Sequence, residues 1–339
     1  MSLFEIEAKE FGDYLFSSGE LTEREREFLT KEEFERMLSS QTKEDFLRVL
    51  NETYYSKYVE DARKSGSLES MTEQETVLSI EYLREHLMEG HRNLIEFLIL
   101  DRDIHNVKVI MKSDYLKKDL KHIFLRSSYT FDDLKSAYDS KDASKLLSPI
   151  KDVMEKLFEI LDGNQDFRII ELKLEQFFFE KLTCYVASSK SEPLIELFKH
   201  RVDMLNIKNV YRAKVAGEKF KYDEFLYEGG KLDSLFFRQF ENESVDFFAQ
   251  SIERGEYTKM IMQGTHLLYS EDTFASFEKN EEEFITRFFF EASKSSTSLE
   301  RVLGFFIRKR FEARSLNIIF SGIANNIARE KIKHRIPGL

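Results

Sequence analysis

The chain has 339 residues and a formal net charge of −11 at pH 7, with 42% hydrophobic and 33% charged residues but only 13 Gly and 3 Pro. So few helix breakers predict a largely helical protein, and the length predicts more than one module. The charge argues against a general nucleic-acid binder, which needs a basic surface, and no uncharged apolar run is long enough to span a membrane.

Threonines mark the expected starts of helices along the chain. We assign caps to five segments in which a threonine is followed three residues later by an acid, namely Thr30–Glu33, Thr42–Asp45, Thr72–Glu75, Thr130–Asp133 and Thr297–Glu300. Such a hydroxyl accepts a backbone N–H at the helix start, and the acid complements the helix dipole. Apolar residues then recur at intervals of three and four, as at Leu194, Leu197, Phe198 and Val202. These patterns predict an all-α protein.

Two pairs of segments repeat with the same spacing. Residues 94–112 align without gaps on residues 194–212, and residues 30–50 align on residues 130–150 at the same offset of 100 residues. Because one offset serves two separated segments, the sequence indicates an internal duplication.

A third copy is expected near the C-terminus, where Asn317 follows the pattern of Asn106 and Asn206. We therefore predict three helical repeats, residues 1–115, 116–220 and 221–339, with the N-terminal segment closing the third. The three asparagines are the predicted structural anchors, because an amide can cap a helix or bond to a neighbouring backbone.

The two ends of the chain carry opposite charge. Residues 1–36, the acidic head, hold eleven Asp/Glu against five Lys/Arg, whereas residues 301–339, the basic tail, hold nine Lys/Arg against two Glu. If the N-terminal segment completes the third repeat, head and tail lie close together. We expect exposed charge pairs to contribute little and apolar side chains to supply most of the attachment, namely Phe4, Phe11, Tyr14 and Leu15. The simpler alternative is that both charged stretches are solvated helix faces.

No residues with catalytic or ligand-binding chemistry fall into a known pattern. His86 and His91 miss the spacing of a zinc helix, and the lone Cys184 lacks the partners of a disulfide or a zinc site. The glycine pair in Glu228–Lys231 predicts a turn and lacks the features of a phosphate loop. We predict no catalytic residue, no cofactor and no metal, and nothing selects partner-binding residues. A hydrolase with unselected carboxylates is a weaker alternative.

The segment Asp103–Lys108 resembles the D-x-x-N segment of the C subunit of the archaeal and bacterial V-type (A-type) ATPases, whose eukaryotic relative is the d subunit, the 39-kDa component. The second copy extends the resemblance from Asp203–Ile207 to Phe225–Lys231. The stretches 34–54 and 312–337 are also similar to the family, so that the resemblance covers nearly the whole chain. At Ile318–Phe320 the sequence departs from the Lys/Arg-rich third motif that is common in the family.

The resemblance implies an all-α protein of three related domains around a pseudo-threefold axis, shaped like a funnel with a central cavity. It also implies a non-catalytic component of the central stalk, a socket that couples the central shaft (D/F-like subunits) to the membrane rotor ring for ATP-linked proton or sodium transport. The expected location is cytoplasmic and peripheral to the membrane. The alternative is a generic helical-repeat adaptor that binds a peptide or a helix.

Overall fold

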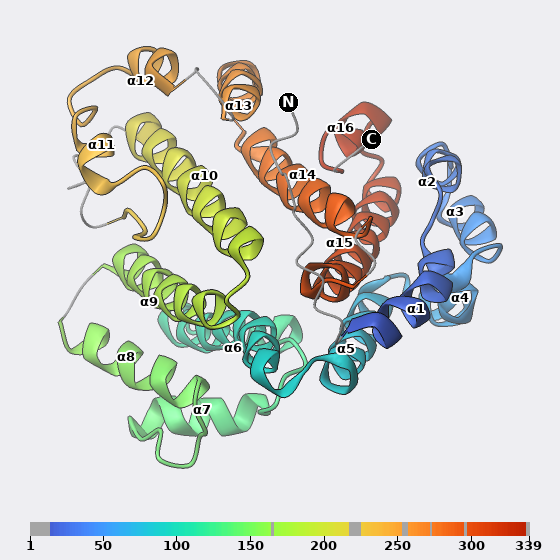
Figure 1. Cartoon of the computed structure of the whole chain (residues 1–339), viewed down its shortest axis with the longest axis horizontal. Helices are drawn as coiled ribbons and strands as arrows, with labels where there is room; N and C mark the ends of the chain where they lie inside the picture. The colour runs from blue at the N-terminus through green and yellow to red at the C-terminus, as the bar shows by residue number, and fades with distance from the viewer. Residues whose placement is uncertain are drawn as a thin grey trace. The chain divides into compact units, whose positions relative to one another are not determined.

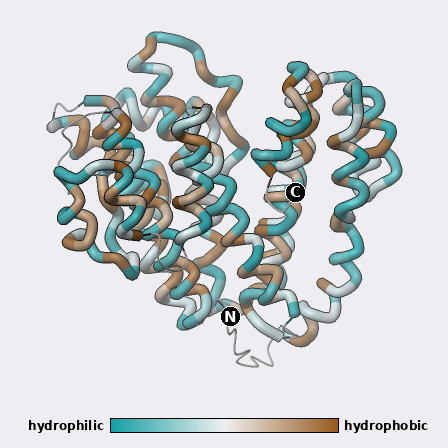
Figure 2. The backbone as a smooth tube through the Cα atoms, turned by 90° about the horizontal axis from the view of Figure 1, so that it is seen from above, coloured by the Kyte–Doolittle hydropathy of each residue, from teal (hydrophilic) through white to brown (hydrophobic). Residues whose placement is uncertain are grey.

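A computed structural model describes residues 14–163, 166–216, 225–252, 257–271, 273–294 and 297–336. These residues form helices and no strand, which confirms the predicted all-α class (Figure 1). They divide into two compact units, one from Met1–Met88 with Asp246–Leu339 and the other from Glu89–Val245. Hydrophilic and hydrophobic positions are mixed along each helix (Figure 2), and among the described helices we find none that is long and apolar enough to cross a membrane.

The first unit contains both ends of the described chain. Its helices are α1 (Leu15–Arg24), α2 (Lys31–Leu38), α3 (Lys43–Leu50), α4 (Val59–Ser65), α5 (Glu69–His86), α13 (Thr258–Glu271), α14 (Ala275–Ala292), α15 (Leu299–Ala324) and α16 (Arg329–Lys333), with the 3-10 helices η2 (Glu25–Glu27) and η3 (Tyr54–Tyr58). Helix α12 (Val245–Ile252) begins at the boundary of the two units.

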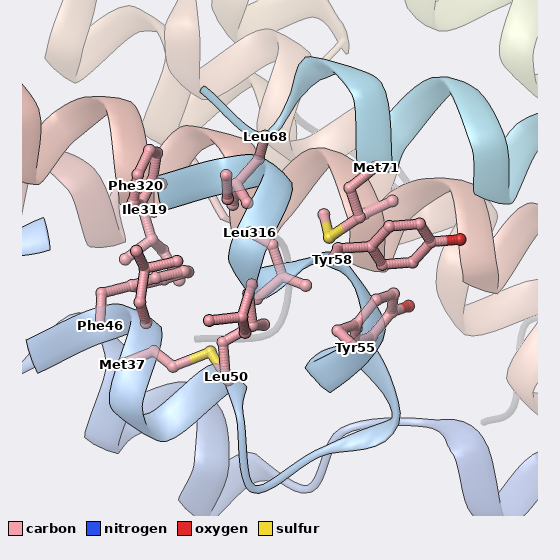
Figure 3. Packing of buried hydrophobic residues seen from close by; sticks show 14 of the residues in the cluster. Met37, Phe46, Leu50, Tyr55, Tyr58, Leu68, Met71, Leu316, Ile319 and Phe320 are labelled. Atoms are coloured by element: carbon pink, nitrogen blue, oxygen red, sulfur yellow. The ribbon is translucent and has the colours of Figure 1, made fainter. Parts of the chain in front are cut away.

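The core of the first unit is organised around α15. This long helix packs against α5 and α14, and α13 packs against α14. Figure 3 shows the apolar cluster in which α15 meets the N-terminal helices, with Leu316, Ile319 and Phe320 facing Phe46 and Leu50 of α3. The rings of Phe46 and Phe320 lie 5.3 Å apart, and all five side chains are at most 1% exposed. A segment from the start of the chain therefore shares one core with a helix from its end.

The second unit is formed by the middle of the chain. Its elements are η4 (Glu89–His91), α6 (Asn93–Leu116), η5 (Lys121–Ile123), α7 (Phe131–Ser140), α8 (Ile150–Asp162), α9 (Phe167–Ser188), α10 (Glu192–Ala216) and α11 (Ser234–Arg238). Helix α6 packs against α7, α8 and α9, and α10 packs against α9. The predicted apolar face of α10 is confirmed, since Leu194, Leu197, Phe198 and Val202 are all buried.

Three of the five predicted threonine caps are confirmed. Thr30 and Thr130 form capping boxes at the starts of α2 and α7, and Thr42 caps α3. Thr72 is not a cap, because the buried Leu68 and Met71 extend α5 back to Glu69. At α15 the cap is Ser298, one residue after the predicted Thr297, and its hydroxyl accepts the N–H of Arg301.

Candidate functional site

The polar side chains that sequence comparison singled out lie midway along two long helices. Asn106 of α6 is fully buried, its Oδ1 accepts the backbone N–H of Leu125 at 2.8 Å, and its Nδ2 donates to the carbonyl of the same residue at 2.9 Å. One amide thus pairs both backbone groups of Leu125, in the loop that leads to Thr130, the N-cap of α7. We call this arrangement a helix–loop clamp.

Asn206 of α10 makes the same clamp. Its Oδ1 accepts the N–H of Tyr227 at 2.8 Å, and its Nδ2 donates to the Tyr227 carbonyl at 2.9 Å. Asn206 is 1% exposed, and Tyr227 precedes Asp233, the N-cap of α11. The oxygen of an amide accepts a hydrogen bond and its nitrogen donates one. A single asparagine side chain can therefore satisfy both the N–H and the carbonyl of a loop residue that has no backbone partner.

Each clamp has an aspartate one turn earlier on the helix. Asp203 Oδ1 accepts the N–H of Leu232 at 3.0 Å, and its Oδ2 accepts that of Lys231 at 3.2 Å. A Cβ on Gly230 would lie 2.1 Å from Asp203 Oδ1, so the predicted glycine turn is needed for this close approach. The equivalent Asp103 is buried, its Oδ1 has no hydrogen-bond partner in the described chain, and burial raises its pKa to about 6.

The third anchor differs from the sequence prediction. Asn317 is half-buried, and its Oδ1 accepts a long hydrogen bond, 3.5 Å, from the Ser321 hydroxyl one turn further along α15. The clamp on α15 is made by Glu312: its Oε2 accepts the N–H of Leu29 at 2.8 Å, and its Oε1 accepts the Tyr55 hydroxyl at 2.5 Å. Leu29 directly precedes Thr30, the N-cap of α2.

Position within the helix explains the difference. Asn106 is residue 14 of α6, Asn206 is residue 15 of α10 and Glu312 is residue 14 of α15, whereas Asn317 is residue 19. The alignment of the repeats selected three asparagines because they are the same residue type. The residue that forms the clamp is instead the one at position 14 or 15 of its helix. A carboxylate accepts the loop N–H as an amide does, while it cannot donate to the loop carbonyl.

Glu312 lies in a buried charged cluster. Burial raises its pKa to about 7, although Lys309 and the hydrogen bonds from Tyr55 and Leu29 oppose the shift. Lys309 is 1% exposed, and its Nζ lies 3.3 Å from Glu27 Oε2 and 4.0 Å from the centre of the Tyr54 ring. Burial lowers the pKa of Lys309. The cluster holds the segment from η2 to η3 against α15.

The acidic head and the basic tail meet, as the sequence predicted, within the residues that the structure describes. The ion pairs connect Glu25 with Arg301 and Arg308, Glu27 with Lys309, and Glu35 with Arg329 and Lys333. Of the apolar side chains expected to attach the head, Phe4 and Phe11 lie outside the described residues. Tyr14 is buried, and the expectation for Leu15 is wrong because its side chain is 65% exposed.

The groups that sequence reasoning missed are Lys309 and Glu312. The one signal in the sequence is their spacing of three residues, which equals that of Asp203 and Asn206. Neither residue stands out by its charge, because Arg308, Arg310 and Arg314 lie in the same stretch of α15. Among the described residues we find no cluster of His, Cys, Asp or Glu that could hold a metal ion. The clamps fix loops onto helices, and this is a structural use of polar side chains.

Comparison with known proteins gives one family and several relatives. The model of the family described as ATP synthase (C/AC39) subunit matches residues 18–335. The chain is 19% identical over 315 residues to the C subunit of the V-type sodium ATPase of Enterococcus hirae, covering 92% of this chain and 94% of that protein. It is 23% identical over 336 residues to the C subunit of the A-type ATP synthase of Desulfurococcus sp., covering 94% of this chain and 89% of that protein. Identity to the C subunit of the A-type ATP synthase of Thermococcus kodakarensis is 20% over 329 residues, with the same two coverages.

Proposed function

The chain belongs to the ATP synthase (C/AC39) subunit family, and we propose that it serves as the C subunit, a non-catalytic component of a V-type or A-type rotary ATPase. The observation that carries the proposal is the match over residues 18–335, with full-length relatives that bear this name. The buried polar side chains support the non-catalytic part of the proposal. Asn106, Asn206 and Glu312 each accept the backbone N–H of a loop residue and so hold that loop against a helix.

Within the complex we propose the role of a socket on the central stalk. The protein would receive the foot of the shaft (D/F-like subunits) and rest on the membrane rotor ring, peripheral to the membrane. A contact that transmits torque must resist slipping, which requires broad complementarity of shape and charge rather than a few reactive groups. A chain in which 33% of the residues are charged has the composition for such polar, salt-sensitive interfaces.

We also keep the three-repeat organisation as a proposal. The repeats, residues 1–115, 116–220 and 221–339, would surround a pseudo-threefold axis and a central cavity that accepts the shaft. The three helix–loop clamps support it, because each joins one long helix to the loop ahead of a capped helix. The third clamp joins the two ends of the chain, as a repeat split between them would require. A structure of the assembled complex is the direct test, and an open solenoid would favour the adaptor function instead.

The functional test compares the ATPase complex in vesicles with and without this chain. We expect the complex that lacks the chain to hydrolyse ATP without moving ions, and we expect added protein to restore ion movement. Unchanged ion movement in its absence would refute the socket. If the soluble catalytic head lost hydrolysis on omission of the chain, a catalytic role would replace the proposed one.

A further inference from the structure

The loop between α6 and α7 runs back along α6 and is held against that helix by three side chains. Nε and Nη2 of Arg102 both donate to the carbonyl of Arg126, at 2.9 and 2.7 Å. Nε2 of His105 lies 3.0 Å from the carbonyl oxygen of Ile123, and Asn106 clamps a residue between these two sites. All of these bonds end on backbone groups of the loop, so its path does not depend on the side chains that it exposes.

The loop concentrates positive charge in an acidic chain. The chain has a net charge of −11, yet residues 117–126 contain one acid and four basic side chains, all exposed, namely Lys117, Lys118, Lys121 and Arg126. Two of these cations have carboxylate partners on the surface, Asp114 at 2.9 Å and Asp132 at 3.3 Å. Lys118 and Arg126 make no ion pair with any described residue. Their charges are therefore available to a partner.

Large apolar side chains are exposed among these cations. Tyr115 is 66% exposed, Leu116 is 50% exposed and Ile123 is 42% exposed. We call residues 115–126 the basic strip. Segments that lie on an anionic membrane have this composition, because cations meet the headgroups while aromatic and aliphatic side chains enter the acyl boundary.

The length of the basic strip decides what kind of ligand it fits. Arg102 and Leu116 are fourteen residues apart on α6, which corresponds to about 21 Å along the helix. The loop begins directly after Leu116 and reaches Arg102 at Arg126, so its cations are spread over about this length. They cannot converge on one phosphate or carboxylate. An acidic polypeptide would offer a row of charges but no apolar medium for Leu116 and Ile123, whereas a bilayer offers both.

We propose that the basic strip docks on an anionic lipid surface, with the lysines and Arg126 among the headgroups and the exposed apolar side chains at the acyl boundary. The loop is already fixed on α6, so little conformational entropy is lost on binding. Attraction between exposed charges is screened by salt, so the interaction is salt-dependent. The basic strip lies within the second unit, and the proposal does not depend on the ATPase function.

The test is co-sedimentation of the full chain with vesicles of phosphatidylcholine alone or of phosphatidylcholine and phosphatidylglycerol in about equal parts. We expect binding to the mixed vesicles only, and we expect it to weaken when the salt concentration is raised from ~0.05 to ~0.5 M. Absence of binding to the mixed vesicles, or equal binding to both kinds, would overturn the proposal.

Variants locate the binding surface. One cation near an anionic membrane contributes about fivefold in affinity, so Lys118→Gln combined with Arg126→Gln should weaken binding about 30-fold. The matched control is Lys64→Gln with Lys145→Gln, which changes the net charge equally and also replaces exposed side chains without an ion pair in the described chain. It should bind like the native chain. An equal loss in both double variants would refute the basic strip as the binding surface.

A third double variant separates a lipid surface from an acidic protein. Leu116→Ser with Ile123→Ser keeps every cation and should still weaken vesicle binding about tenfold, because the apolar side chains no longer enter the acyl boundary. Soluble poly-glutamate is the probe for the other class of partner. Binding to poly-glutamate with none to the mixed vesicles would assign the basic strip to an acidic protein and overturn the proposal.

Discussion

The carboxylate of Glu312 accepts the backbone N–H of Leu29, although 283 positions separate the two residues in the chain. The distance is 2.8 Å, and Glu312 is almost completely buried. This one bond fixes the start of α2 to the middle of α15, and it places a carboxylate where water cannot stabilise its charge. The stability of the first unit is therefore expected to depend on the protonation of Glu312.

The first prediction concerns the pH dependence of stability. The pKa of Glu312 is raised from 4.5 to about 7 in the folded chain, so folded protein keeps a proton that unfolded protein releases. The contribution to the free energy of unfolding is fully present below pH 4.5 and is lost as the pH rises to about 7. The difference between these two pKa values corresponds to ~3 kcal/mol in the free energy of unfolding.

Urea unfolding of the native chain and of Glu312→Gln, at several pH values, measures this contribution. The difference between the two should decrease by ~3 kcal/mol between pH 4.5 and 7 and stay flat above, because glutamine does not titrate. Glu23→Gln is the control, since it removes a carboxylate whose side chain is 68% exposed. If the difference in unfolding free energy from the native chain changed with pH equally for Glu312→Gln and Glu23→Gln, a special role of Glu312 would be contradicted.

The second prediction concerns the clamps. Asn106→Ala should destabilise the chain by ~3 kcal/mol, because it leaves both backbone groups of Leu125 without their partner. Asn317→Ala is the matched control, and we expect less than ~0.5 kcal/mol, since that amide makes one long hydrogen bond. Denaturant unfolding measures both. Equal losses would restore Asn317 as the third anchor in place of Glu312.

The third prediction concerns the contact of α13 with α14. A Cβ on Gly264 would lie 2.4 Å from the ring of Phe277, which is fully buried, so Gly264→Ala should cost ~1–3 kcal/mol. Gly19→Ala is the opposite case, because beyond its chain neighbours and the backbone of its own helix no atom lies within 4 Å of the new methyl group. Alanine favours the helix there, and we expect a gain of ~0.5–1 kcal/mol. Thermal unfolding measures the melting temperature of both variants. A change in the same direction for Gly264→Ala and Gly19→Ala would contradict the prediction.

The fourth prediction concerns Lys309. Its replacement by methionine removes the cation that faces Glu27 and Glu312, and we expect a loss of ~3 kcal/mol at pH 7.5. The loss should be smaller at pH 5, because a proton on Glu312 neutralises one of the two carboxylates. Combining Lys309→Met with Glu312→Gln should recover part of the stability at pH 7.5. Strictly additive losses in a double-mutant cycle would show that the two residues are not coupled.

The local structure of this protein follows from its sequence to a large extent. The apolar spacing of Leu194–Val202 and the caps at Thr30 and Thr130 depend on neighbours within one or two helical turns, and they are visible in the sequence for that reason. The gap-free offset identified Asn106 and Asn206, which make the same bonds. The opposite charges of the two ends indicated that they would meet.

Only the tertiary structure decided which side chain clamps the third long helix and which face of α1 is buried. The partner of Glu312 comes from the other end of the chain, so no local pattern specifies the pair. The sequence led us to expect that Leu15 attaches the head, yet α1 buries its serines and Leu21 instead. On this helix Glu20 contacts His86 and Arg24 lies over the ring of Tyr82, and both partners come from α5. Local spacing fixes the helices, whereas the pairing of distant polar groups is fixed by which helices the fold brings together.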